Sequence, residues 1–89
     1  MPSFKGKTVM ITGAAGNLGR ATANAFDRAG ANLVLVDLDA DALDVAYPGD
    51  EGQRIKCPLN LLAPDEIEAA VVEAKVGFGR IDILAAIAG

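Results

Sequence analysis

Short apolar runs recur along the chain at regular intervals. Residues 8–12 and 33–36 are two such runs, and residues 81–88 form another that only Asp82 interrupts. Unbroken apolar runs are typical of strands that are buried on both faces, as in a parallel sheet covered by helices. Residues 55–59 alternate between apolar and polar positions and predict a further strand with one wetter side. The apolar positions of this strand are Ile55, Cys57 and Leu59.

Between these runs the apolar residues recur at helical spacing. Residues 18–29 predict a first helix that stops at Gly30, and a short helix over residues 40–46 follows, with Asp39 as its N-cap. The helical spacing of apolar residues over 64–78 predicts the longest helix, and Pro64 suits its first turn. The expected inward faces are Leu18, Ala21, Ala25 and Ala29, with Phe26 at the edge, in the first helix; Ala40, Leu43 and Ala46 in the second; and Ile67, Ala70, Val71, Ala74 and Phe78 in the third.

The alternation of strands and helices predicts an α/β fold. Right-handed crossovers between parallel strands lead to a Rossmann-type doubly wound sheet of order 3-2-1-4. Pro58 agrees with this order, because it places the third strand at an edge, where a missing N–H breaks no ladder hydrogen bond. The fourth strand is more apolar than an edge strand should be. We therefore expect residues 1–89 to be the N-terminal half of a larger domain.

Composition excludes several classes of function. The 89 residues have a formal net charge of −4, no histidine and one cysteine, Cys57. Zinc sites need His or Cys ligands that are missing here, and an acidic chain without a basic run does not suit nucleic acid. No apolar run approaches the roughly 20 residues of a membrane helix, and residues 1–7 lack the apolar core of a secretory signal. We expect a cytoplasmic protein without a metal, nucleic-acid or membrane partner, in which Cys57 is a small buried residue.

The candidate chemistry lies where the first strand meets the first helix, in Thr12-Gly13-Ala14-Ala15-Gly16-Asn17-Leu18-Gly19. Glycines allow a tight turn and a close approach of the backbone to a pyrophosphate. The amides that open the helix, near Asn17 and Leu18, would point at the phosphates, and the helix dipole attracts anions. Glycines also occur at such turns for steric reasons alone, so the turn by itself leaves binding open.

Asp37 ends the second apolar run, eighteen residues after Gly19. Its carboxylate can accept hydrogen bonds from both hydroxyls of an adenosine ribose, and it would repel a 2′-phosphate. No Lys or Arg stands at positions 38 and 39 or within residues 13–19; Arg20 lies just beyond. The carboxylate could instead solvate the strand end or cap the next helix. In this order within one strand–helix–strand unit, the turn and Asp37 favour dinucleotide binding, with NAD preferred over NADP.

These residues resemble the short-chain dehydrogenases and reductases, and the resemblance covers essentially the whole chain. The first turn of that family reads Thr-Gly-x-x-x-Gly-x-Gly, which Thr12, Gly13 and Gly19 match. Asn17 stands at the central glycine, with Gly16 before it, and asparagine tolerates the left-handed backbone that such a turn requires. The resemblance implies that a pyrophosphate lies against Gly13, Gly16, Asn17, Leu18 and Gly19, and that Asp37 is the ribose-binding acid.

Two later segments extend the resemblance. Asn60 stands where the family has an aspartate that binds the adenine amino group, which implies that Asn60 accepts this bond and that the Leu61 backbone contacts adenine N1. Residues 86–89, Ala-Ile-Ala-Gly, replace the family's Asn-Asn-Ala-Gly, and backbone contacts from Ala86 and Ala88 to the cofactor riboses are implied. The lost asparagines normally tie neighbouring strands together. The expected unit is thus the N-terminal half of a dinucleotide-binding Rossmann domain.

The resemblance also implies an activity for the full-length protein: hydride transfer between a nicotinamide cofactor and a carbonyl or secondary alcohol of a small-molecule substrate. It further implies that the full-length protein forms a homo-oligomer. Family members carry a catalytic Ser and a Tyr-x-x-x-Lys pair beyond the fourth strand. Here Tyr47 is followed four residues later by Glu51, and Ser3 lies in the tail, so this chain carries no catalytic residue. Two other interpretations stay open: a non-catalytic dinucleotide-binding module, and the front half of an adenosyl-methionine-dependent methyltransferase.

Overall fold

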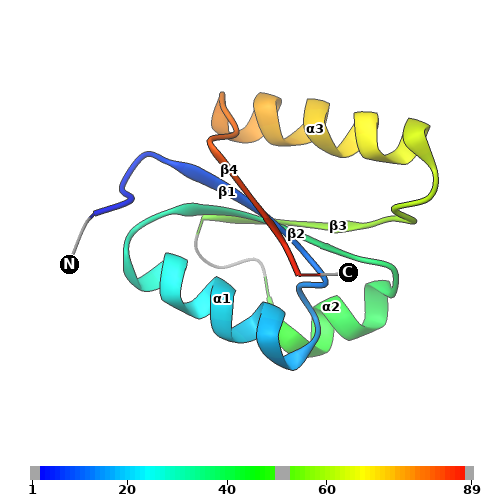
Figure 1. The fold of residues 1–89 in the computed structure, drawn as a ribbon, viewed down its shortest axis with the longest axis horizontal. Helices are drawn as coiled ribbons and strands as arrows, with labels where there is room; N and C mark the ends of the chain where they lie inside the picture. The colour runs from blue at the N-terminus through cyan, green and yellow to red at the C-terminus, as the bar shows by residue number, and fades with distance from the viewer. Residues whose placement is uncertain (1–2, 50–52, 88–89) are drawn as a thin grey trace.

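The computed structural model describes residues 3–49 and 53–87, in which strands and helices alternate strictly (Figure 1). Every predicted element is present. Only the last strand differs clearly from the expected range, because residues 81, 82 and 87 lie outside β4 and residue 88 is not among the described residues. The elements are β1 (Thr8–Thr12), α1 (Asn17–Arg28), β2 (Asn32–Asp37), α2 (Ala40–Ala46), β3 (Arg54–Pro58), α3 (Pro64–Phe78) and β4 (Ile83–Ala86).

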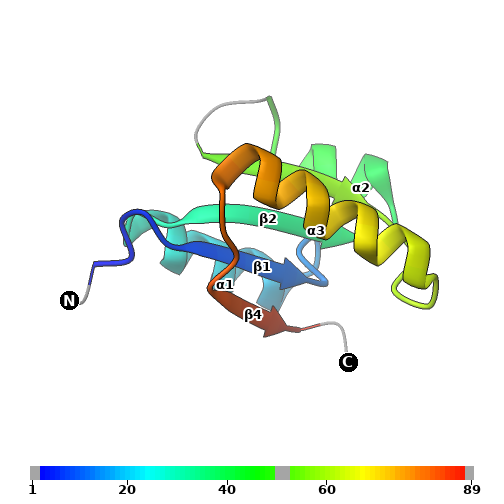
Figure 2. The ribbon, with the colours of Figure 1, turned by 90° about the horizontal axis from the view of Figure 1, so that it is seen from above.

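The four strands form a parallel sheet of order β3-β2-β1-β4, which Figure 2 shows from above. The fold class and the strand order are those predicted from the sequence. β1 is central: Met10 pairs with Val34 of β2 on one side and with Leu84 of β4 on the other. β3 lies at an edge, where Pro58 is exposed opposite Asp37. The absence of an N–H group at Pro58 therefore breaks no hydrogen bond between β3 and β2.

Helices cover both faces of the sheet, α1 and α2 on one and α3 on the other (Figure 1). Successive strand residues point to opposite faces, so each face has its own cluster of buried side chains. The cluster under α1 and α2 contains Val9, Ile11, Ala14, Ala23, Ala31, Leu33, Leu35, Leu43 and Tyr47. The cluster under α3 contains Met10, Val34, Val36, Cys57, Leu59, Ala70 and Ala74. The two central strands are buried on both faces, as their unbroken apolar runs predicted.

The buried face of α1 is not the predicted one. Leu18 is 65% exposed, Ala21 and Ala25 are also exposed, and the buried residues are Gly19 and Ala23. The cause is a close approach of backbones: α1 lies so near the turn that precedes it that only glycine fits at position 19. This contact fixes the rotation of the helix. A count of apolar residues placed Leu18 inward because hydrophobicity does not report how closely two backbones approach.

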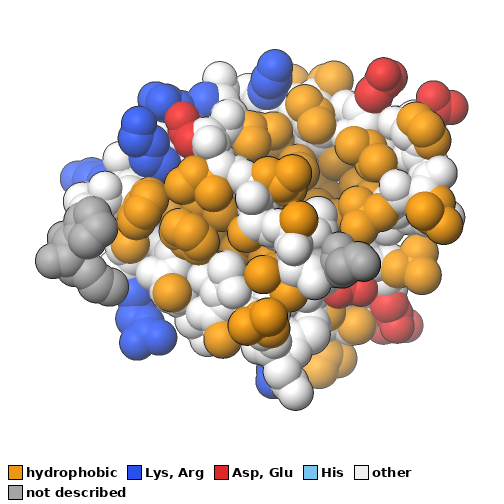
Figure 3. Space-filling model, viewed as in Figure 1, with side chains coloured by type: hydrophobic (Ala, Val, Ile, Leu, Met, Phe, Trp, Pro, Cys, Tyr) orange, Lys and Arg blue, Asp and Glu red, His pale blue; other side chains and the backbone are white. Residues whose placement is uncertain are grey.

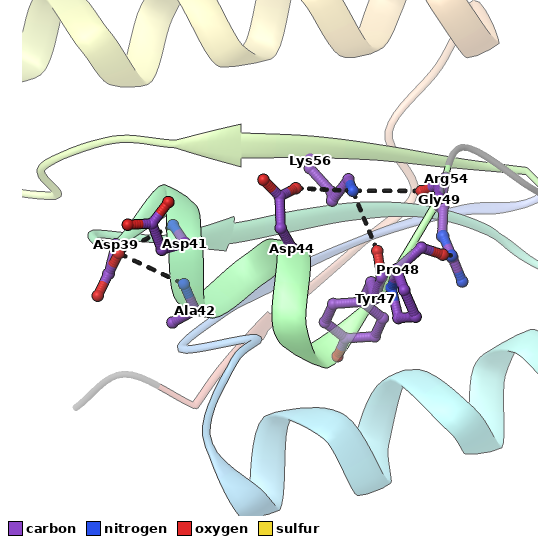
Figure 4. Close-up of polar contacts among 9 residues, drawn as sticks. All are labelled: Asp39, Asp41, Ala42, Asp44, Tyr47, Pro48, Gly49, Arg54 and Lys56. Carbon is purple, nitrogen blue, oxygen red and sulfur yellow. Dashed lines mark hydrogen bonds and ion pairs between the residues drawn. The ribbon is translucent and has the colours of Figure 1, made fainter.

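The other two helices follow their patterns more closely. α3 buries Ala70 and Ala74, and the remaining three residues of its predicted face pack partly against the core. α2 begins as predicted, because Asp39 Oδ1 accepts hydrogen bonds from the N–H groups of Asp41 and Ala42 at 2.9 and 3.3 Å (Figure 4). Leu43 is the one buried residue of α2, and Ala40, expected inward, is exposed at the first position of this seven-residue helix. None of the described helices is long and apolar enough to span a membrane.

β4 leaves apolar side chains exposed. It pairs with β1, and within the described residues no strand pairs with its other edge. Leu84 is 63% exposed although it lies beside Met10 on the face of α3, and Val72 and Val76 of α3 are exposed as well. Figure 3 shows hydrophobic side chains across the middle of this side of the molecule. The strong hydrophobicity of this strand in the sequence is therefore not explained by packing among the described residues.

Asp82, the charged residue in the last apolar run, joins β4 to the start of β1. Its Oδ2 accepts a hydrogen bond from the Thr8 N–H at 2.9 Å, and its own N–H donates to the Thr8 carbonyl at 2.9 Å. Arg80 donates to Oδ1 through Nε at 2.9 Å and through a terminal nitrogen at 2.6 Å. The Arg80 bonds first, and then the Thr8 bond, hold the pKa of the Asp82 carboxyl below its ordinary value.

Replacing Asp82 with asparagine should make the stability of the chain less dependent on pH in the acid range. A carboxyl whose pKa is lowered by folding stabilises fully above its unfolded pKa of about 3.9, and this contribution disappears as pH falls through the lowered value. Urea unfolding should give Asp82→Asn a lower free energy of unfolding than the parent at pH 7, and this difference should be smaller at pH 3. Asp27→Asn on the exposed side of α1 is the control for charge. An equal difference at both pH values would contradict this account.

Candidate functional site

The turn between β1 and α1 lies at the carboxyl edge of the sheet, where open α/β sheets bind ligands. Gly13 has a φ of 70°, and its carbonyl oxygen accepts a hydrogen bond from the Gly16 N–H at 3.2 Å. Asn17, expected to be left-handed, is instead the first residue of α1, and the positive φ angles of the described residues are all at glycines. Gly13 supplies the left-handed position, so the turn does not require one at Asn17.

Gly19 brings α1 directly against this turn. A Cβ at position 19 would lie 2.8 Å from Ala14 Cα and from the Gly13 carbonyl carbon, and closer still to the Gly13 oxygen. All three are backbone atoms, which cannot move aside as the end of a side chain can. Gly19 is buried in this contact. The match of this glycine to the sequence motif therefore reflects a steric requirement of the fold as well as a candidate site for a ligand.

The first turn of α1 offers backbone donors that nothing within the helix uses. Its N-cap, Gly16, has no side chain to accept from them, and no acidic residue lies in this turn. By contrast, Asp39 caps α2 and acids open α3. The first N–H groups of a helix have no intrahelical acceptor, and the helix dipole favours a negative charge beside them. The amides of Asn17 and Leu18, both exposed residues, are thus suited to an anion.

Asp37 ends β2 beside the turn and is half-buried. Its Oδ2 accepts a hydrogen bond from the Ala15 N–H at 3.0 Å, and its Oδ1 accepts one from the Leu38 N–H at 2.8 Å. An ionised carboxylate has about four lone-pair sites, so Asp37 keeps capacity for further donors. The side chain both fixes the turn and presents acceptors at the edge of the sheet.

A cavity at this edge joins residues from three loops. Its volume is about 230 Å³, below the roughly 300–1,000 Å³ of most whole-ligand sites, so it suits a nucleoside-sized part of a longer molecule. Its polar side chains are a carboxylate and an amide, and its apolar surface comes from leucines. The lining residues are Gly13, Asp37, Leu38, Leu59, Asn60 and Leu61. Four of the residues that the sequence motifs predict to bind a nucleotide thus meet in one cavity.

Asn60 shapes the loop after β3 through its own hydrogen bonds. Its Oδ1 accepts from the Leu62 N–H at 2.9 Å, and its carbonyl oxygen accepts from the Ala63 N–H at 3.0 Å. Its N–H donates to Glu66 Oε1 at 3.4 Å. The first of these bonds is an Asx turn, in which a side chain substitutes for a backbone carbonyl. The turn holds Leu61, 39% exposed, at the wall of the cavity.

The other selected residues lie outside the cavity. Asn17, Leu18 and Gly19 form the first turn of α1, next to Gly13. Ala86 ends β4 and pairs with Thr12, on the far side of β1 from the cavity. Ala88 lies outside the described residues. The candidate site is therefore a strip along the carboxyl edge of the sheet, from the loop after β3 to the end of β4.

Comparison with known proteins assigns the family. The sequence model of the short chain dehydrogenases matches residues 7–89. The chain belongs to the short-chain dehydrogenase family. It is 36% identical to an NAD-dependent glycerol dehydrogenase of Listeria innocua, covering 93% of this chain and 33% of that protein. It is 40% identical to the oxidoreductase UcpA of Salmonella typhimurium, covering 100% of this chain and 35% of that protein. The chain thus spans about a third of the length of these relatives.

Solved structures of short-chain dehydrogenases share the fold. A glucose/ribitol dehydrogenase-type enzyme of Brucella melitensis is similar with a TM-score of 0.86 and 38% identity, covering 94% of this chain and 37% of that one. A 3-ketoacyl-(acyl-carrier-protein) reductase of Brucella melitensis, complexed with NADH, is similar with a TM-score of 0.84 and 30% identity, covering 92% and 34%. These likenesses agree with the sheet order described above.

One departure from the short-chain dehydrogenase pattern coincides with an unpaired buried hydroxyl. Thr12 is 6% exposed, and its Oγ1 makes no hydrogen bond to any described residue. Its partner in β4, Ala86, stands where the family pattern has asparagine, and a methyl group can neither donate nor accept. A buried hydroxyl without a partner costs about 1–3 kcal/mol. At this position only the backbone ladder joins β1 to β4.

Tyr47 touches the turn, although no sequence motif predicted it to belong to the site. Its hydroxyl donates a hydrogen bond to the Ala14 carbonyl at 2.7 Å, and the residue is 6% exposed. Tyr47 follows Leu43 by four positions on the apolar side of α2, which could have predicted that it is buried. No local pattern shows that its hydroxyl reaches a loop 33 residues earlier in the chain.

A second cavity of about 170 Å³ lies between β3 and α3 and includes Cys57. Cys57 is 5% exposed, as predicted, and its Sγ lies 3.6 Å from Glu73 Oε2. Burial first, and then the charge of Glu73, raises the pKa of the Cys57 thiol to about 12. Within residues 3–49 and 53–87, no group of three or more His, Cys, Asp or Glu residues is placed to hold a metal ion.

Cys57 should therefore react very slowly with thiol reagents while the chain is folded. Raising the pKa from 9.0 to about 12 reduces the thiolate fraction near pH 8 by roughly a thousandfold, and only the thiolate reacts. Absorbance assays with a disulfide reagent should give a native rate at least roughly a hundredfold below that in 8 M urea, a denaturing condition. Glu73→Gln should accelerate the native reaction only modestly, since burial is the larger cause. Equal rates in the native and unfolded protein would contradict the account.

Proposed function

We propose that the chain binds the ADP-ribose part of NAD along the carboxyl edge of its sheet. The pyrophosphate lies against the turn and the amides that open α1, the carboxylate after β2 holds the adenosine ribose, and the loop after β3 holds the adenine. The residues assigned to the site are Gly13, Gly16, Asn17, Leu18 and Gly19 for the pyrophosphate, Asp37 for the adenosine ribose, Asn60 and Leu61 for the adenine, and the backbones of Ala86 and Ala88 for the cofactor riboses.

The observation that carries this proposal is the shared cavity of Gly13, Asp37, Asn60 and Leu61. These residues come from the ends of three strands that are well separated in the sequence. A purely steric role for the glycines does not require them to meet. The cavity combines an acceptor for ribose hydroxyls with apolar walls for a base, beside the free amides of α1. This combination fits the ribose and base of an adenine nucleotide, which supports the assignment.

The charges around Asp37 favour NAD over NADP. A 2′-phosphate would lie beside the Asp37 carboxylate, which would repel it at short range. Leu38 and Asp39 offer no positive charge, and the guanidinium of Arg20 is exposed and bonded to Asn17 Oδ1 at 3.2 Å. Two similar proteins support this preference: one is named as NAD-dependent, and another was solved with NADH.

We infer that the full-length protein is an oxidoreductase. A bound nicotinamide cofactor supplies hydride chemistry toward a carbonyl or secondary alcohol of a small molecule. The described residues bind and orient the cofactor, and the groups that move the proton would come from the rest of a full-length protein. A cytoplasmic location and a homo-oligomeric assembly belong to the same proposal. The free, buried Cys57 is consistent with a reducing compartment.

Titration calorimetry with NAD, NADP, nicotinamide mononucleotide and adenosyl-methionine tests the proposal. We expect NAD to bind with a Kd at least roughly tenfold below that of NADP, and nicotinamide mononucleotide to bind much more weakly because it lacks the adenosine half. Tightest binding of adenosyl-methionine would contradict the proposed preference for a nicotinamide dinucleotide. No binding of NAD to a chain shown to be folded would contradict the proposal.

A further inference from the structure

One peptide unit of the turn is held by hydrogen bonds at both of its polar atoms. The Ala14 carbonyl oxygen accepts from the Tyr47 hydroxyl at 2.7 Å, and the Ala15 N–H donates to Asp37 Oδ2 at 3.0 Å. These two groups belong to the same planar peptide and point in opposite directions. A rotation that releases one bond therefore also breaks the other. Through this peptide, the orientation of the Asp37 carboxylate depends on a residue at the end of α2.

Tyr47 is itself fixed from several sides. It is the C-cap of α2, and its N–H donates to the Leu43 carbonyl at 2.8 Å. Lys56 of β3 donates to the Tyr47 carbonyl at 3.0 Å and to Asp44 at 2.9 Å, as Figure 4 shows. The Arg54 guanidinium lies 5.8 Å from the centre of the Tyr47 ring, within the range of a cation–π contact. The ring thus has little freedom to follow a moving turn.

The hydroxyl is a donor throughout the physiological range of pH. Burial raises the pKa of Tyr47, while the charges of Arg20 and Arg54 act in the opposite direction and that of Asp37 adds to the rise. The phenol therefore stays protonated, and the Ala14 carbonyl, which can only accept, always meets a donor. Without that hydroxyl, the carbonyl would lie against the buried side of the turn with no partner and would tend to rotate toward water.

We propose that Tyr47 is a positioning residue of the nucleotide site: by holding the Ala14–Ala15 peptide, it aims the Asp37 carboxylate at the ribose and so raises both the affinity for NAD and its preference over NADP. This inference rests on the proposed function. It assigns to α2 a part in cofactor choice, although α2 lines no wall of the cavity. Tyr47 acts only through the peptide and does not touch the nucleotide.

Tyr47→Phe tests the inference, because it removes the hydroxyl and keeps the ring in the core. We expect the Kd for NAD to rise about tenfold and the Kd for NADP to change less, so that the ratio of the two narrows. In the ligand-free chain, the Ala15 amide should shift in the ¹H–¹⁵N NMR spectrum and exchange with solvent faster, since it loses its carboxylate acceptor. The amides of α3 should be unaffected.

Phe78→Leu is the matched control, since Phe78 packs against the other core cluster, under α3. It should lower the melting temperature without changing the ratio of the two Kd values or the Ala15 amide. An unchanged Ala15 amide in Tyr47→Phe, or a loss of NAD affinity no larger than in Phe78→Leu, would overturn the inference while the parent still binds NAD. Failure of the parent chain to bind NAD would instead be a failure of the proposed function, and the two results are therefore distinguishable.

Discussion

Asp37→Asn should weaken NAD binding by about ten- to a hundredfold and remove most of the discrimination against NADP. Hydrogen bonds to a charged group contribute about 1.5–3 kcal/mol each, and asparagine keeps the shape of the side chain while losing the charge and one acceptor. The same loss of charge removes the repulsion of a 2′-phosphate. Isothermal titration of the variant with both dinucleotides measures the two effects separately.

Asp41→Asn is the control for Asp37→Asn, because Asp41 is an exposed acid of α2 outside the cavity, and its replacement changes the net charge equally. It should leave both Kd values within about twofold of the parent, since the charge of an exposed side chain outside the cavity is screened by water and salt. If Asp37→Asn bound NAD as tightly as the parent did, Asp37 would be a structural residue of the turn and would not bind the ribose.

Gly19→Ala should destabilise the chain by about 3 kcal/mol, a large part of the stability of a small domain. The added methyl group would lie 2.8 Å from two backbone atoms of the turn, and nearer to the Gly13 oxygen, so α1 must move away from β1 or the turn must open. Either movement uncovers the core beneath Ala23. Chemical denaturation followed by circular dichroism measures the loss.

Gly16→Ala is the matched control within the same turn. Its φ is −75°, which alanine adopts freely, and its Cβ would lie 3.5 Å from the Gly13 oxygen, an ordinary van der Waals contact. We expect a loss of no more than about 1 kcal/mol, mostly from a poorer N-cap. Equal losses for the two variants would show that glycine is needed for backbone freedom throughout the turn, and the close approach at Gly19 would not be the cause.

Much of the fold could be predicted because the evidence for it was local. Unbroken apolar runs identified β1 and β2 as buried strands, alternation marked β3, and Pro58 placed β3 at the edge where it lies. The rotation of α1 could not be predicted in the same way. It depends on a backbone contact at Gly19, and a glycine contributes nothing to a hydrophobic pattern.

The site was predictable to the extent that it consists of residues at strand ends. Gly13 follows β1, Asp37 ends β2 and Asn60 lies two residues after β3, and parallel strands bring their carboxyl ends to one edge. The supporting contacts were not predictable, because they join segments far apart in the chain. Tyr47 reaches the turn across 33 residues, and Asp82 reaches Thr8 across 74. Such bonds depend on the packed structure, and no periodic pattern in the sequence predicts them.

The most direct test of the account is a ¹H–¹⁵N NMR titration of the chain with NAD. We predict that the amides of residues 13–19 and those of Leu38, Asn60 and Leu61 shift together along one saturable curve, while those of Val72 and Val76 on α3 stay in place. Spectra that superimpose with and without NAD, from a chain whose dispersed resonances show that it is folded, would contradict the claim that this edge of the sheet holds a dinucleotide.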